Sequence, residues 1–158
     1  MKKTIKTSDI LNAYNVLKMA KYSAMEDADK IKAWKIARAL KPIATKFDDD
    51  SKDAAEKLKP EIDGGFDEVL GKVQEYERMI RDTKADMTKL PMGAAEYNAF
   101  ITKLKEYNKL VGKAVEEFAN VENEIEFEPL SENAFGKLIA SNDWTVGQVE
   151  VLGDIVCE

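Results

Sequence analysis

Two stretches of this sequence carry large apolar or aromatic residues at alternating intervals of three and four positions. The first covers residues 66–90 and the second covers residues 97–121. Alternating threes and fours keep one side of an α-helix facing one partner, as in a coiled coil. The sequence Leu-Pro-Met-Gly at 90–93 separates the two stretches and is typical of a turn. We therefore predict an antiparallel helical hairpin over residues 66–121, with two unrelated helices of similar spacing as the alternative.

The first 47 residues carry the pattern of a short strand followed by two helices. In residues 2–7, KKTIKT, an extended chain places Ile5 on one face and Lys2, Thr4 and Lys6 on the other. This pattern is typical of a strand. Thr7 or Ser8 is expected to cap the first helix. The second helix should begin near Asp27. We expect a kink or a short break at Pro42, because proline removes a backbone donor and disfavours helical geometry at the preceding residue.

The remaining segments alternate between loop and regular structure. Residues 48–65 contain three consecutive aspartates, a proline and a Gly-Gly pair, and we predict a loop or hinge there. Residues 121–128 alternate valine, isoleucine and phenylalanine with glutamates, which predicts a half-buried strand. Two short helices should follow. Ser131 is the expected cap of the first, and Thr145 with Gln148 forms a capping box for the second.

Together these elements predict a mainly α fold with a helical hairpin and a minor two-stranded β element. A length of 158 residues favours a single domain over residues 1–158. Its parts, in chain order, are a basic N-terminal region (1–47), a loop or hinge (48–65), a helical hairpin (66–121) and an acidic strand with two C-terminal helices (122–158).

Charge is divided unevenly along the chain. Residues 1–46 hold eleven basic and four acidic residues, whereas the rest of the chain holds thirteen and twenty-six, for an overall net charge of −6. A basic region can signal a nucleic-acid partner. It can equally pack on the acidic part of the same chain. Strand 2–7 and strand 121–128 suit this second interpretation, because opposite charges across a strand pair are mildly favourable.

Several kinds of catalytic and metal site lack their usual residues here. The chain has no histidine, and Cys157 is its only cysteine, so imidazole bases and Cys/His zinc sites are excluded. No phosphate-binding glycine loop occurs. The aspartates at 48–50 do not have the glycine and glutamate spacing of a calcium loop. We therefore predict no catalytic residue, no metal site and no cofactor, and we expect the protein not to be an enzyme.

One basic and aromatic cluster remains as a candidate contact surface. On a helical wheel of the second helix, five residues lie opposite its apolar side: Ile31, Trp34, Lys35, Arg38 and Lys41. Such a cluster could bind an acidic protein surface, or contact phosphates and stack on a base. The alternative is that Trp34 packs on a neighbouring helix while the long basic side chains extend around it.

Five segments resemble small uncharacterised proteins encoded by tailed phages and prophages: KKTIKTSDILNAYNVL, KIKAWKIARALKPI, EYNAFITKLKEYN, ENEIEFEPL and SNDWTVGQVEVLGDIV. The resemblance covers most of the chain in the order and character of its elements, and departs most over residues 48–92. It implies a phage origin and no defined activity, so no functional residue is carried over. Small phage proteins of this kind are typically virion or assembly components, or factors that block a host protein.

The expected function is therefore that of a non-enzymatic protein-binding factor whose partner is a host or phage protein. A nucleic-acid-associated protein that uses the basic N-terminal helices is the alternative. No apolar run approaches the ~20 residues of a membrane span, and we expect no membrane partner. The lone cysteine favours a reducing compartment, so we expect the cytoplasm, which is the host cytoplasm if a phage encodes the chain. A virion location and the oligomeric state stay open.

Overall fold

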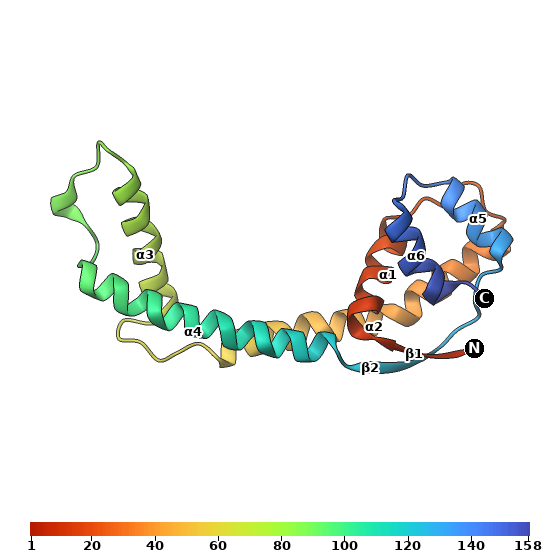
Figure 1. Ribbon diagram of the computed structural model, residues 1–158, viewed down its shortest axis with the longest axis horizontal. Helices are drawn as coiled ribbons and strands as arrows, with labels where there is room; N and C mark the ends of the chain where they lie inside the picture. Colours follow the sequence, from red (N-terminus) through yellow and green to blue (C-terminus); the bar gives the residue numbers. More distant parts are fainter. The chain divides into compact units, whose positions relative to one another are not determined.

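The computed structural model describes residues 1–158 and is mainly α-helical, with a small antiparallel sheet of two strands (Figure 1). The predicted fold class is confirmed. In chain order the elements are β1 (Lys2–Lys6), α1 (Thr7–Met19), α2 (Asp27–Lys57), α3 (Phe66–Arg81), the 3-10 turn η1 (Met87–Lys89), α4 (Ala94–Ala119), β2 (Glu122–Glu126), α5 (Glu132–Ala140) and α6 (Val146–Val156). None of the helices combines the length and the apolar character that a membrane span requires.

The chain contains two compact units. The terminal unit consists of residues 1–51 and 116–158, and the central unit of residues 52–115. The boundary passes through two long helices, α2 and α4, so each of them contributes residues to both units. Each unit has an apolar core of its own.

The core of the terminal unit is built by helices from both ends of the chain. Its fully buried large side chains come from α1, α2, α5, α6 and the segment before α5: Ile10, Leu17, Ile36, Leu40, Leu130, Leu138, Leu152 and Val156. On α1, α2 and α6 these residues recur at intervals of four or seven, so one side of each helix is apolar. The termini are held together because both contribute to this core.

The two strands pair as the sequence predicted. β1 and β2 are antiparallel, and their register places Lys2 opposite Glu126 and Lys6 opposite Glu122. Ile5 and Ile125 are buried. A two-stranded ribbon is only marginally stable by itself, so burial of this apolar face against the helices sustains it. The basic strand therefore packs on the acidic part of the chain.

The predicted cap of the first helix is wrong. Helix α1 begins at Thr7, Lys6 occupies the capping position, and no side chain caps the helix there. The Thr7 hydroxyl instead donates to the carbonyl oxygen of Val121, at 3.1 Å. That bond fastens the start of α1 to the segment before β2. The Thr7 hydroxyl therefore bonds to a residue distant in the sequence and does not cap its own helix.

The predicted break at Pro42 and the predicted loop over 48–65 are also corrected. Helix α2 contains Pro42 and continues to Lys57, so the loop covers only residues 58–65. Proline removes a single helical hydrogen bond, and burial of Leu40 and Ala44 on either side holds the helix on the core. Beyond Asp50 the sequence is rich in Ala, Lys and Glu, which favour helix. Gly64 and Gly65 both have positive φ, at 88° and 86°, which explains why the chain turns at this pair.

The central unit contains the two arms of the predicted hairpin, but the first arm is shorter than expected. Aromatic rings join the arms in opposite order: Phe66 lies 5.0 Å from Tyr107, and Tyr76 stacks on Tyr97 at 4.6 Å between centroids. Figure 1 shows α3 inclined to α4 rather than lying along it. The apolar cluster of this unit includes α4 residues from Tyr97 to Tyr107 and none beyond. The three-four spacing within residues 66–90 places Ile80 in the predicted seam, but Ile80 is 50% exposed, so this part of the prediction is wrong.

Local polar contacts explain why the first arm ends at Arg81 and not near residue 90. The Asp82 carboxylate accepts a hydrogen bond from the backbone N–H of Lys84, and the Asp86 carboxylate accepts one from Thr88. Such side-chain turns offer the backbone an alternative to the helix. The caps predicted for α5 and α6 are confirmed. Ser131 caps α5, and Thr145 with Gln148 forms a capping box at α6.

Candidate protein-contact surface on helices α1 and α2

Helix α2 presents all five residues of the candidate contact surface to solvent. Ile31, Trp34, Lys35, Arg38 and Lys41 are all exposed. On the other side of the helix, Ala33, Ile36 and Leu40 are completely buried. The helical period of 3.6 residues produces this separation of faces. We refer to the five exposed residues, together with Tyr14 and Lys18 of α1 described below, as the Trp34 surface.

The indole of Trp34 is largely uncovered. Its relative exposure is 56%, and that of Ile31, one turn earlier, is 54%. The guanidinium carbon of Arg38 lies 5.3 Å from the centre of the Trp34 ring, a cation–π arrangement. Part of the Trp34 side chain is covered and lies beside α1, as the alternative expected, but more than half of the residue meets solvent. Two large apolar side chains are thus available to a partner.

Helix α1 adds two residues that the sequence did not assign to this surface. Tyr14 and Lys18 line a pocket of about 360 Å³ together with Trp34, Ala37, Arg38 and Lys41. The Lys18 ammonium lies 5.8 Å from the centre of the Tyr14 ring. The pocket therefore holds two cation–π pairs, one from each helix. Ile31 and Lys35 lie on the same exposed side of α2 but do not line the pocket.

The reason for missing Tyr14 and Lys18 lies in how a helical wheel sorts residues. On the wheel Tyr14 belongs to the apolar side of α1, and Lys18 points away from that side. In the structure Tyr14 is partly buried against the core and also lines the pocket. Their spacing of four residues was the available signal, because side chains four apart on a helix are neighbours.

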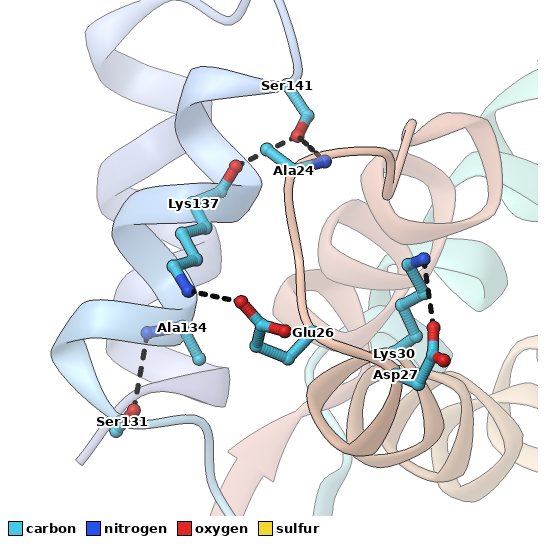
Figure 2. A network of polar contacts seen from close by, with 8 residues as sticks. All are labelled: Ala24, Glu26, Asp27, Lys30, Ser131, Ala134, Lys137 and Ser141. Atoms are coloured by element: carbon cyan, nitrogen blue, oxygen red, sulfur yellow. Dashed lines mark hydrogen bonds and ion pairs between the residues drawn. The ribbon is translucent and has the colours of Figure 1, made fainter.

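The connection between α1 and α2 is fastened to α5, which fixes the two helices that form the pocket (Figure 2). The Ala24 backbone N–H donates to the Ser141 hydroxyl at 3.1 Å. The Lys137 ammonium lies 3.0 Å from the Glu26 carboxylate. Asp27, at the start of α2, is paired with Lys30 at 3.2 Å. The two carboxylates that precede the basic part of α2 are therefore already engaged by cations.

The positive charges of the Trp34 surface form no ion pair with the rest of the chain. Residues 10–25 and 30–47 contain no aspartate or glutamate. No ion pair involves Lys18, Lys35, Arg38 or Lys41. Lys32, on the adjacent side of α2, does pair with Glu128 at 2.7 Å. The hydrogen bond from Lys32 holds the pKa of the Glu128 carboxyl below its ordinary value, and the charge of Lys35 adds a smaller effect.

The chemistry of this surface is suited to binding. Aromatic rings and aliphatic carbons form the walls of the pocket, and three cationic groups, those of Lys18, Arg38 and Lys41, stand around it. Such a site attracts carboxylates or phosphates and gives an apolar group a place to lose contact with water. Comparison of the chain with protein-family models, curated proteins and solved structures finds no match.

Proposed function

We propose that the protein is a non-enzymatic binding factor of phage type that docks on another protein through the Trp34 surface. Its role would be that of a virion or assembly component, or of an inhibitor of a host protein. The observation that supports the proposal is the exposed pair Trp34 and Ile31 on a helix whose opposite side is fully buried. Large apolar side chains that are exposed together, with polar residues around them, are characteristic of interaction sites.

The residue types strengthen this interpretation. Tryptophan and arginine are the residues most enriched among the energetic hot spots of protein interfaces. Here the guanidinium of Arg38 lies over the Trp34 ring, so the two side chains are already side by side before a partner binds. Preorganisation reduces the entropy that a partner must offset when it binds. A single docking event could thus cover Ile31, Trp34 and Arg38 together.

A specific observation also favours nucleic acid as a second candidate partner. Lys18, Arg38 and Lys41 surround the rings of Tyr14 and Trp34, and cations interleaved with aromatic rings suit a phosphate backbone and stacked bases. Phosphate contacts would make the affinity for nucleic acid fall steeply with ionic strength. Titration of a labelled single-stranded oligonucleotide at low and high salt therefore separates the two candidates.

The deciding experiment is affinity capture from host or infected-cell lysate with the purified protein, followed by mass spectrometry and direct binding measurements with the captured protein. The double variant Trp34→Ala, Arg38→Glu should remain folded, since both side chains are exposed, and should lose the captured partner. The matched control is Ile80→Ala, Arg81→Glu, which changes an exposed apolar residue and an adjacent arginine on α3. Equal capture by the double variant and the wild type would overturn the proposal.

A further inference from the structure

We infer that the occupant of the Trp34 surface is an acidic segment of another protein that inserts one large apolar side chain between Tyr14 and Trp34. This inference rests on the proposed function, because it specifies the partner of the same surface. Two independent observations carry it: the unpaired positive charge around the pocket and the concave apolar wall within it.

Charge complementarity argues for carboxylates on the partner. Lys18, Arg38 and Lys41 line the pocket and take part in no ion pair. The acidic residues at the borders of the two acid-free stretches, 10–25 and 30–47, are Asp9, Glu26, Asp27, Asp29 and Asp48. Of these, Glu26 is held by Lys137 and Asp27 by Lys30. The surface therefore offers cations with no carboxylate of its own chain in contact. Complementary charge speeds encounter and selects partners.

The shape of the pocket argues for an inserted side chain. Its volume of about 360 Å³ lies near the small end of the range of ligand pockets. Tyr14, Trp34 and Ala37 supply its apolar wall. A leucine or phenylalanine side chain that enters the pocket is stabilised because its apolar surface leaves water. Carboxylates on either side of that residue would then face the three cations.

The same features fit a nucleic-acid strand less well. One side of the Trp34 ring already faces the guanidinium of Arg38, which leaves a concave pocket and not an open platform for successive bases. The whole chain also carries a net charge of −6, which opposes the approach of a long polyanion at low salt. An acidic peptide segment needs no open stacking platform, and because it carries few charges, the net charge of the chain opposes its approach less strongly.

The test uses a display library of short random peptides selected on the full-length protein. Each selected peptide is then measured on wild type and on Trp34→Ala, with Arg38→Gln as a second variant in case the first is destabilised. We expect the selected peptides to share acidic residues around one large apolar residue, and to bind Trp34→Ala at least ~10-fold more weakly. Replacing their carboxylates by amides should weaken binding to wild type about 10-fold. Arg38→Glu, Lys41→Glu should select basic peptides instead.

The outcomes separate failure of the inference from failure of the proposed function. If the selected peptides are neutral or basic and bind Trp34→Ala more weakly than wild type, the inference of an acidic occupant is wrong, while the surface remains a docking site. Selected peptides that bind Trp34→Ala and Arg38→Gln as tightly as wild type would place binding elsewhere and overturn both. An oligonucleotide that displaces the selected peptides and binds more tightly would make nucleic acid the occupant. Self-association of wild type, lost on Trp34→Ala in light scattering, would make it a second copy of this chain.

Discussion

The ammonium group of Lys3 donates a hydrogen bond of 2.9 Å to the carbonyl oxygen of Ile155, near the other end of the chain. The same ammonium also reaches the carbonyl oxygens of Asp154 and Cys157, at 3.0 and 3.3 Å. These oxygens belong to the last turn of α6 and the residue after it. The last carbonyl groups of a helix lack helical partners, and a cation is favourable there. Lys3 thus caps the C-terminal helix from the N-terminal strand.

We predict that Lys3→Met lowers the free energy of unfolding by about 1–2 kcal/mol, because hydrogen bonds to a charged donor contribute this much. The matched control is Lys2→Met. Lys2 is exposed, faces Glu126 across the sheet and should contribute well under ~1 kcal/mol. Urea unfolding of the three proteins, followed by circular dichroism, measures the difference. Equal losses in the two variants would show that Lys3 has no capping role.

Removal of residues 1–6 should destabilise the terminal unit. The deletion takes away the pairing partner of β2, the buried side chain of Ile5 and the cap from Lys3. Loss of a buried isoleucine alone costs about 2–5 kcal/mol. Differential scanning calorimetry should therefore give a clearly lower melting temperature. If the truncated protein melts at the temperature of the intact chain, the N-terminus is a free basic arm, and the nucleic-acid alternative gains support.

The central unit offers a paired test of the aromatic and apolar contacts between α3 and α4. Val73 is 2% exposed and belongs to the core of this unit, whereas Ile80 is 50% exposed on the same helix. Val73→Ala should destabilise by about 1–3 kcal/mol and Ile80→Ala by under ~0.5 kcal/mol. Chemical denaturation compares the two. If Ile80→Ala lowers the free energy of unfolding more than Val73→Ala does, the contact between the two arms extends to Ile80, as the sequence pattern predicted.

The ion pair between Lys32 and Glu128 should give a small pH dependence. Because the hydrogen bond from Lys32 lowers the pKa of Glu128 in the folded protein, this pair stabilises the fold above the ordinary pKa of a glutamate. The contribution is lost as the pH falls through the lowered value. In an NMR titration of the Glu128 carboxyl, Lys32→Met should raise the midpoint. Lys35→Met should raise it less, since Lys35 acts only through its charge. Equal shifts would argue against the hydrogen bond.

The sequence by itself determined the local structure. Alternation with period two marked β1 and β2, and their opposite charges indicated that the two strands pair. Ser131 and the Thr145–Gln148 box marked the starts of α5 and α6. Each of these signals acts within a few residues, through backbone geometry or through contact between adjacent strands. The helical period likewise showed that Trp34 and its basic neighbours lie opposite an apolar face.

The tertiary structure decided which faces meet and how far each contact extends. The three-four spacing marks one side of α3 as apolar, but the inclination of α3 to α4 covers Val73 and leaves Ile80 in solvent. Pro42 locally favours a break, but α2 continues past it because residues on both sides of Pro42 are buried in the core. The meeting of Tyr14 with Trp34 depends on how α1 and α2 pack, because periodicity records a residue's position on its own helix, while burial between helices depends on residues distant in the chain.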